Sequence, residues 1–166
     1  AAGHDVTTMV RYVSGGRYSF YIDERTVFAD LRDSREVREA ILKAKPDAIV
    51  HLAAMSAVSY SFTHPEEVAE IVYLGTVRIA EAARAAGAHL IHASTSEVYG
   101  GSGARPPFTE ETPQGGTSPY GAAKVAAEAY LASAKRIWGQ PVTIMRPFNT
   151  VGRAPMRNRH YVVERA

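Results

Sequence analysis

Short runs of apolar and β-branched residues alternate with helical patterns along almost the whole chain, and this alternation restricts the fold more than any other feature. The strand-like runs are residues 6–12 (VTTMVRY), 26–31 (TVFADL), 47–54 (DAIVHLAA), 89–94 (HLIHAS) and 142–148 (VTIMRPF). Helical patterns stand between most of these runs. Strands that alternate with helices predict an α/β fold with a parallel sheet and crossover helices.

The segment from Thr63 to Gly87 carries the clearest helix pattern. Thr63 and Glu66 have the spacing of a capping box, and Gly87 is a typical residue at which a helix stops. The apolar residues between them that share one stripe are Val68, Ile71, Val72, Ile79, Ala82, Ala83 and Ala86. Residues 47–54, in contrast, are nearly all apolar, which is typical of a strand covered on both faces.

Composition excludes several classes of protein and site. The 166 residues, 46% hydrophobic and 22% charged, predict one soluble domain with a single core. The absence of cysteine excludes disulfides, thiolate catalysis and cysteine–metal sites. His89 and His92 are three residues apart on a strand and so point to opposite faces, and we expect no metal site.

The same composition bears on partners and location. The formal charge is only +2, with one dense basic stretch at residues 153–165, so we expect no nucleic-acid partner. No apolar run approaches the about 20 residues that a membrane span needs, and the N-terminus lacks a signal-peptide pattern. We therefore expect a cytoplasmic chain with no membrane partner.

The strand-like run at residues 89–94 ends in polar residues. It continues into ASTSEVYG (93–100), with three hydroxyls and one carboxylate. Ligands of open α/β sheets bind at the carboxyl ends of the strands, so these side chains are expected to face a ligand. Residues 100–119 follow as a Gly-, Pro- and Thr-rich segment, and loops of this length in compact domains tend to be functional.

Tyr120 and Lys124 stand four residues apart at the start of an alanine-rich helical pattern, and so share one helix face. At a separation of about 5 Å and an effective dielectric near 20, their Coulomb interaction is roughly 3 kcal/mol. This interaction would lower a phenol pKa of about 10 by about 2 units. Such a tyrosine could act as a base near neutral pH. An ordinary pair on a helix surface has the same spacing, so the spacing alone leaves both interpretations open.

Four motifs, taken in order, give the chain a family resemblance. They are HLAAMSAVSYSF (51–62), ASTSEVYG (93–100), SPYGAAK (118–124) and RPFNTVG (146–152), and VFADLRD (27–33) is similar to the family's third-strand motif. The chain resembles the extended short-chain dehydrogenase/reductases, the nucleotide-sugar epimerases and dehydratases, from Gly3 to Gly152. This resemblance implies a doubly wound Rossmann-type sheet, a smaller C-terminal substrate domain, and NAD or NADP as the cofactor.

The resemblance also implies roles for the polar motifs. Thr95 matches the catalytic Ser/Thr, Tyr120 the base that deprotonates the sugar 4-hydroxyl, and Lys124 the lysine that holds the ribose. Glu97 stands where 4,6-dehydratases carry the group that removes the C5 proton. Ser96 departs from the Thr-Asp-Glu of dTDP-glucose dehydratases and is more similar to the GDP-mannose 4,6-dehydratase pattern.

The reaction stays open at this point. UDP-glucuronate decarboxylases also carry TSEVYG, 4-epimerases and 4-ketoreductases are neighbouring alternatives, and Glu97 could merely cap a loop near the site.

For the cofactor, the resemblance implies that Asp30 and Leu31 meet the adenine. The residues expected to border the adenosine and pyrophosphate are Leu52, Ala53 and Ala54. Arg11 stands at the end of the expected second strand and suits a 2′-phosphate, which favours NADP over NAD, although a solvent-facing arginine fits the position too.

The implied substrate is a nucleotide-diphosphate sugar. Asn149 matches a position near the diphosphate, Ser56 lies in a loop that often touches the sugar, and Ser96 accompanies Glu97 at the strand end. The family commonly forms homodimers through two helices per subunit, and their counterparts here are residues 66–86 and 120–135.

The glycine-rich phosphate loop of the family, GxxGxxG, has no counterpart in the sequence, since GGRYSF (15–20) has the wrong place and spacing. The strand that carries it would lie centrally, between residues 6–12 and 47–54, so we expect a gap with two unpaired inner edges. We assign residues 1–152 to a partial dinucleotide-binding domain and 153–166 to a remnant of, or entry to, a substrate domain. The expectation is a part of a longer enzyme, or an inactive fragment that serves as a binding or assembly module.

Overall fold

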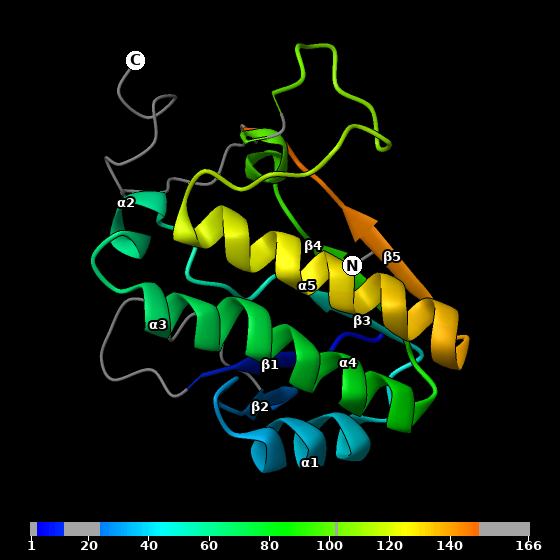
Figure 1. The fold of residues 1–166 in the computed structure, drawn as a ribbon. Coiled ribbons are helices and arrows are strands. Elements are labelled where there is room, and N and C mark those ends of the chain that lie inside the picture. The colour runs from blue at the N-terminus through cyan, green and yellow to red at the C-terminus, as the bar shows by residue number, and fades with distance from the viewer. Residues whose placement is uncertain (1–2, 12–23, 102, 150–166) are drawn as a thin grey trace.

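The computed structural model describes residues 3–11, 24–101 and 103–149, which form an α/β fold with parallel strands. The strands are β1 (Thr8–Val10), β2 (Thr26–Phe28), β3 (Ala48–His51), β4 (His89–Ala93) and β5 (Val142–Met145). β1 pairs with β2, and β3, β4 and β5 form a second sheet in that order, with every pair parallel (Figure 1). The predicted fold class, an incomplete Rossmann-type sheet, is confirmed.

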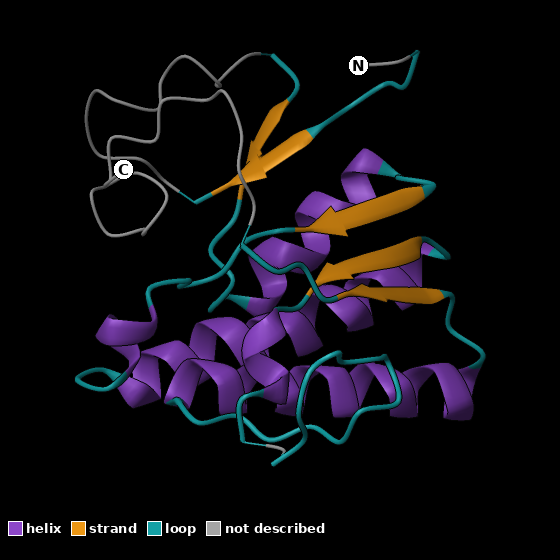
Figure 2. Cartoon of the chain, turned by 90° about the horizontal axis from the view of Figure 1, so that it is seen from above, coloured by secondary structure: helices purple, strands orange, loops and turns teal. Residues whose placement is uncertain are grey.

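The predicted gap lies between β1 and β3, which share no ladder of hydrogen bonds, so that the described strands divide into two sheets (Figure 2). The expectation that residues 47–54 are covered on both faces is wrong for the described part of the chain, because Val50 in β3 is 56% exposed. Ile49 packs against the core, and the next residue, Val50, projects from the opposite face of the sheet, where it stays accessible. Residues 15–20 and 153–166 lie outside the described residues.

The helical elements account for the segments between the strands. They are α1 (Ser34–Ala44), α2 (Val58–Ser61), α3 (Pro65–Val68), the π-helical turn η2 (Ala69–Leu74), α4 (Gly75–Ala86), the 3₁₀ turn η3 (Ser96–Tyr99) and α5 (Pro119–Trp138). α3, η2 and α4 follow one another directly, so the predicted helix over residues 63–87 exists, and Gly87 ends it in the left-handed conformation at φ 69°.

The capping box predicted at the start of this helix is wrong. His64, not Thr63, is the N-cap residue, and its side chain makes no cap hydrogen bond. The Thr63 hydroxyl instead donates to the Tyr60 carbonyl at 3.1 Å. Pro65 is the reason for the shift, because its fixed φ and missing N–H suit the first position of a helix and so place the start there.

The main core lies where α4 and α5 pack with α1 and the strands. Its members include Val37 on α1, Ile79 on α4, Leu90 on β4 and Leu131 on α5, all essentially inaccessible to solvent. α4 and α5 lie side by side in front of β3 to β5 (Figure 1). The parallel direction of the strands brings their carboxyl ends to one side, as the arrowheads in Figure 2 show.

Candidate active site

The first two turns of α5 hold the tyrosine–lysine pair. Ser118 is the N-cap of this helix, and its hydroxyl accepts from the Gly121 N–H at 3.0 Å. Tyr120 and Lys124 are only 7% and 3% exposed, and the Lys124 Nζ lies 6.0 Å from the centroid of the Tyr120 ring. The Lys124 ammonium donates to the Ala93 carbonyl at the end of β4, at 2.6 Å. Burial of both residues separates this pair from an ordinary one on a helix surface.

Lys124 has an unusual electrostatic environment. Burial lowers its pKa to about 8, against the opposing effect of the Glu128 carboxylate one turn further along α5. It takes part in no salt bridge of the described residues. An ammonium that is buried and not neutralised by a carboxylate is free to stabilise negative charge on a neighbouring phenolate or to donate to a ligand hydroxyl.

Two buried histidines lie near this lysine. His51 ends β3 and His92 lies opposite it on β4, with ring centroids 5.4 Å apart. Burial, and secondarily the Lys124 charge, lowers the pKa of His51 to about 4 and that of His92 to about 3. Both imidazoles are therefore neutral at neutral pH and add no positive charge beside Lys124. Sequence reasoning had treated His92 only as an improbable metal ligand.

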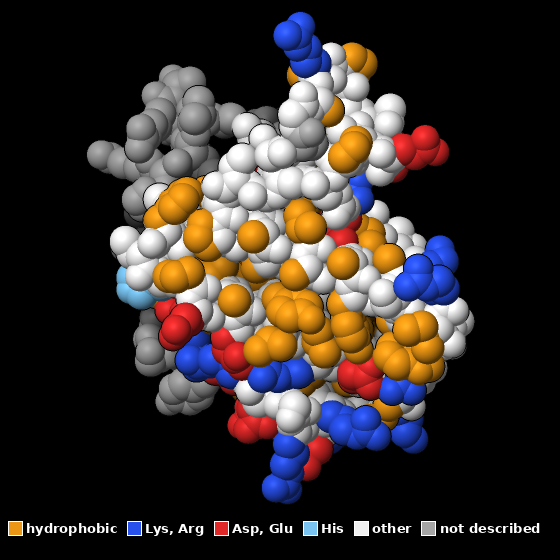
Figure 3. All heavy atoms as spheres, viewed as in Figure 1, with side chains coloured by type: hydrophobic (Ala, Val, Ile, Leu, Met, Phe, Trp, Pro, Cys, Tyr) orange, Lys and Arg blue, Asp and Glu red, His pale blue; other side chains and the backbone are white. Residues whose placement is uncertain are grey.

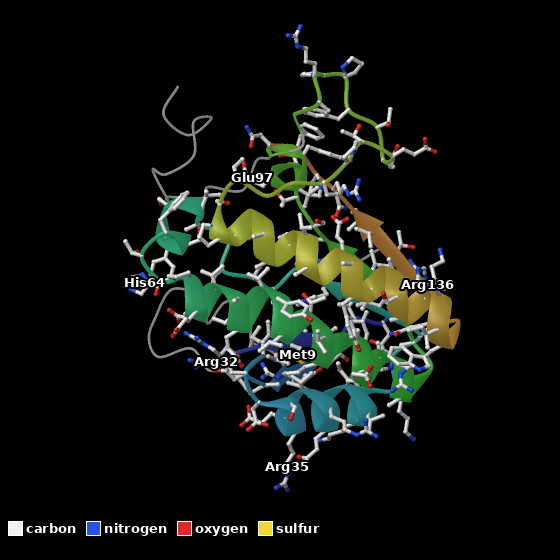
Figure 4. All side chains as sticks on the ribbon, in the orientation of Figure 1. Met9, Arg32, Arg35, His64, Glu97 and Arg136 are labelled. Carbon is white, nitrogen blue, oxygen red and sulfur yellow. The ribbon has the colours of Figure 1, made fainter. Side chains whose placement is uncertain are left out.

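The strand-end run of hydroxyls forms a tight turn beside α5. Thr95 is the N-cap of η3, and its hydroxyl accepts from the Glu97 N–H at 3.3 Å. The Glu97 carbonyl lies 3.4 Å from the position that a Cβ on Gly121 would take, so η3 and the first turn of α5 are in close contact. Glu97 lies beside the N-terminal end of α5 (Figure 4). The four predicted catalytic positions thus lie in η3 and in the adjoining first two turns of α5.

The other candidate substrate positions lie at the same edge of the sheet. The Ser96 N–H donates to the Pro147 carbonyl at 3.0 Å, which holds the η3 turn against the segment after β5. Asn149 belongs to that segment and is exposed. Ser56, also exposed, follows β3. Because β3, β4 and β5 are parallel, all three positions follow carboxyl ends of neighbouring strands.

The predicted adenine-binding residues follow β2. The Asp30 carboxylate accepts from Arg32 Nε at 3.0 Å and from Arg32 Nη2 at 2.6 Å. This fork of hydrogen bonds lowers the pKa of Asp30 to about 2, and the charge of Arg11 at the end of β1 contributes. Leu31 is buried, and its carbonyl accepts from Arg78 at 2.9 Å. The sequence analysis assigns no role to Arg32, although it lies in the VFADLRD motif, and none to Arg78, which lies in no motif.

The predicted adenosine border follows β3. Leu52 is 69% exposed, Ala53 is exposed and Ala54 is half-buried. An accessible apolar surface at a strand end, with buried Lys124 and Tyr120 further along the edge, fits the adenosine and the nicotinamide ribose of a dinucleotide.

The described residues include no group of three His, Asp or Glu side chains placed to hold a metal ion. Within the same ranges, no helix is long and apolar enough to cross a membrane.

Comparison with known proteins decides the family. Residues 4–166 match the family model described as GDP-mannose 4,6 dehydratase. The chain belongs to this family. It is therefore a member of the extended short-chain dehydrogenase/reductases, as its motifs predict.

Individual members of the wider family give further likenesses. The chain is 38% identical to the dTDP-glucose 4,6-dehydratase of Mycobacterium tuberculosis over 130 residues. The matched region covers 77% of this chain and 39% of that enzyme. The crystal structure of the UDP-glucose 4-epimerase of Thermus thermophilus in complex with NAD has a TM-score of 0.78 and 29% identity, over 87% of this chain and 47% of that one. The structure of RMD from Pseudomonas aeruginosa complexed with NADPH has a TM-score of 0.69 and 28% identity, over 78% of this chain and 45% of that one. The chain thus spans less than half the length of each of these proteins.

Proposed function

We propose that the protein to which this chain belongs is an NAD(P)-dependent nucleotide-sugar 4,6-dehydratase that acts on GDP-mannose or a similar sugar. The observation that carries the proposal is the η3 turn, in which Thr95 and Glu97 stand two residues apart and pack against the helix turn of Tyr120. A dehydratase needs one group for the C4 oxygen and a second acid/base group for the C5 proton. Thr95 and Tyr120 are the proposed groups for the C4 oxygen, and Glu97 is the proposed group for the C5 proton.

Tyr120 is the proposed base that removes the proton of the sugar 4-hydroxyl. Thr95 donates its hydroxyl hydrogen to the same oxygen, which helps to orient it. Lys124, as a buried ammonium, stabilises the phenolate of Tyr120 and holds the ribose hydroxyls of the cofactor. NAD(P), held by Lys124 and by the residues after β2 and β3, would supply the hydride acceptor for C4 and the hydride donor for C6. Redox balance is therefore maintained without an external reductant.

Glu97 acts in the elimination. Once C4 is a ketone, the proton on C5 becomes acidic because the carbanion is delocalised into the carbonyl. The Glu97 carboxylate removes this proton and, now protonated, donates it to the C6 hydroxyl, which leaves as water. The C5–C6 double bond of the resulting 4-keto sugar then accepts hydride at C6 and a proton at C5, which gives a 4-keto-6-deoxy sugar.

NADP is the favoured cofactor. Arg11 lies close enough to Asp30 for its charge to affect that carboxyl, so a guanidinium is present on the proposed adenosine side. A cationic side chain there suits a 2′-phosphate. The structure of RMD from Pseudomonas aeruginosa contains NADPH and that of the Thermus thermophilus epimerase contains NAD, so relatives are found with each.

A 4-epimerase is the second candidate, favoured by the likeness to the Thermus thermophilus epimerase. That reaction uses Thr95, Tyr120 and Lys124 as above but requires no second acid/base group at Glu97. A decarboxylase or a 4-ketoreductase would share the same first three residues. An inactive binding module is favoured by the lack of a glycine-rich phosphate loop in the sequence.

A homodimer is part of the proposal. Hydrophobic side chains gather over α4 and α5 on the face shown in Figure 3. Tyr130 on α5 donates to Glu81 on α4 at 2.6 Å, which marks the seam between the two helices on that face. We expect α3 to α4 and α5 of two subunits to form the dimer contact, in a cytoplasmic enzyme.

Product analysis tests the proposal. The full-length protein is incubated with NADP and, separately, with GDP-mannose, dTDP-glucose, UDP-glucose and UDP-glucuronate, and the sugar products are identified by mass and NMR. Loss of one water with a ketone at C4 is the expected result. An isomer of unchanged mass would establish the epimerase, loss of CO₂ the decarboxylase, and no turnover with bound dinucleotide would leave the binding module.

A further inference from the structure

A buried ion pair lies behind the proposed active site. Arg146, directly after β5, meets Glu128 on α5, and their side chains are 17% and 3% exposed. Arg146 Nη2 donates to one Glu128 oxygen at 2.7 Å, and Nε donates to the other at 3.1 Å. Two parallel bonds of this kind fix the guanidinium in one orientation. Glu128 stands one helical turn beyond Lys124, so the pair adjoins the catalytic face of α5.

The same guanidinium also holds the long segment that follows η3. Arg146 Nη1 donates to the Tyr99 hydroxyl at 2.8 Å and to the Glu110 backbone carbonyl at 2.9 Å. The guanidinium carbon lies 5.1 Å from the centroid of the Tyr99 ring. The Glu128 carboxylate accepts a further hydrogen bond from Gln114. One arginine and one glutamate therefore connect β5, α5, η3 and the loop.

The loop is also closed at its foot beside η3. The Gly115 N–H donates to the Val98 carbonyl at 2.7 Å, and the Gly101 N–H donates to the Gly115 carbonyl. Gly116 packs so closely on the backbone of α5 that a Cβ on it would overlap Ala122. The foot of the loop is thus fixed by backbone contacts, and its outer part by Arg146 and Glu128.

Two proposed active-site segments depend on this arrangement. Tyr99 belongs to the same short turn as Glu97, two residues away. Arg146 is three residues before Asn149, and the Phe148 ring lies 6.4 Å from that of Tyr99. Any movement of Arg146 would be passed to both segments through directly bonded or stacked groups.

We infer that Arg146 is a positioning residue that, with Glu128, sets the orientation of the Glu97 turn for removal of the C5 proton. The inference rests on the proposed function. A charge pair retained only for stability is replaceable by apolar residues of similar volume. Here the pair also supplies hydrogen bonds to Tyr99, Glu110 and Gln114, which an apolar replacement cannot make. Loss of the pair should therefore change the position of the η3 turn and of the loop even where the protein still folds.

The test is the double variant E128L/R146M in the full-length protein, since joint replacement leaves no buried charge unpaired. Two rates are measured with GDP-mannose: reduction of bound NADP, which reports oxidation at C4, and incorporation of solvent deuterium at C5. We expect the C5 rate to fall by about 10-fold or more, since displacement of a reacting group by about 1 Å can cost about 100-fold. The C4 rate should change by less than about 3-fold, because the joint replacement removes the negative charge of Glu128 and the positive charge of Arg146 together and so leaves the net charge beside Lys124 unchanged. R146K, which keeps the charge but not the fork, should restore part of the C5 rate.

The matched control is R35M/E39L, which removes an ion pair of 2.8 Å that is exposed on α1 and remote from η3. Hydrogen exchange of residues 103–116 is measured in parallel, and we expect faster exchange in E128L/R146M but not in the control. Equal slowing of both rates in E128L/R146M, or an unchanged ratio of the rates with unchanged exchange, would overturn the inference. If the wild type oxidised no nucleotide sugar, the proposed function would fail instead, and unchanged exchange of the loop would then refute the positioning role independently.

Discussion

Burial of Lys124 couples its charge to the stability of the protein. The pKa of its ammonium falls from 10.5 to about 8 on burial. Between these two values the unfolded chain binds more protons than the folded one, so the free energy of unfolding rises with pH through this interval. The rise is on the order of 3 kcal/mol. Lys124→Met should remove it, whereas Lys43→Met, an exposed substitution on α1, should retain it. Urea unfolding at about pH 7 and about pH 10 measures the difference, and an equal pH slope in Lys124→Met and wild type would contradict this account.

His92 makes the stability of the protein sensitive to acid. Neither of its ring nitrogens has a hydrogen-bond partner in the described structure, and its pKa is lowered by burial to about 3. As the pH falls below 6.5, His92 binds a proton in the unfolded chain but not in the folded one, so the free energy of unfolding decreases. His92→Phe keeps a ring of similar size without a titrating group, so it should unfold at a lower pH than wild type. His64→Phe, at an exposed position, is the control and should leave the acid midpoint unchanged. Acid unfolding followed by circular dichroism decides, and an unchanged midpoint in His92→Phe would count against the assignment.

At the scale of elements, the N-cap of α5 affects both the stability of the protein and the geometry of the proposed active site. Ser118→Ala removes the hydrogen bond to Gly121 and should cost about 1 kcal/mol. Asp33→Ala removes the corresponding cap of α1, where the carboxylate accepts from Arg35 and Glu36, at a similar cost. Only Ser118→Ala should also lower turnover, because the capped turn carries Tyr120. Melting temperatures and steady-state kinetics of both variants test this, and equal turnover in the two would show that the cap does not position the tyrosine.

The helix over residues 63–87 shows what sequence can and cannot predict at this scale. Its apolar stripe predicted the helix and Gly87 predicted its end, because periodicity and a left-handed glycine are local signals. The π-helical turn η2 has no such signal, since one extra residue per turn is decided by packing. Gly75 follows it directly and would place a Cβ 3.2 Å from the Leu31 Cβ, so helix and β2 loop approach closely there. The capping box failed because Pro65 competes for the same start.

At the scale of the whole molecule, the sequence predicted which segments meet but not the groups that hold them. The family resemblance of the motifs implied that Glu97 and Tyr120 serve one site, and the η3 turn of Glu97 indeed lies against the first turn of α5. Arg146 and Glu128 are 18 residues apart and belong to a strand end and a helix interior, so no local pattern pairs them. The bond from Arg78 to the Leu31 carbonyl spans 47 residues and is likewise a product of tertiary packing.

The proposed dimer is also a property of the whole molecule. Ala126 is half-buried on α5, one turn before Tyr130, whose hydroxyl bridges to α4. Ala126→Arg would place a guanidinium in the proposed apolar contact and should convert the dimer of the full-length protein to monomers. Leu42→Arg, at an exposed apolar position on α1, should leave the dimer intact. Sedimentation velocity over a range of concentrations measures both, and a monomeric wild type or a dimeric Ala126→Arg would refute this contact.

The central claim is that Glu97 removes the C5 proton, and a single-turnover comparison of wild type, Glu97→Gln and Glu111→Gln tests it most directly. Glu111 is an exposed glutamate of the 100–118 loop and serves as the matched control. With GDP-mannose and bound NADP, Glu97→Gln should still reduce the cofactor as C4 is oxidised, but should lose water at least about 100-fold more slowly, as expected for removal of a general base. Glu111→Gln should dehydrate at the wild-type rate. Dehydration by Glu97→Gln at the wild-type rate would contradict the account.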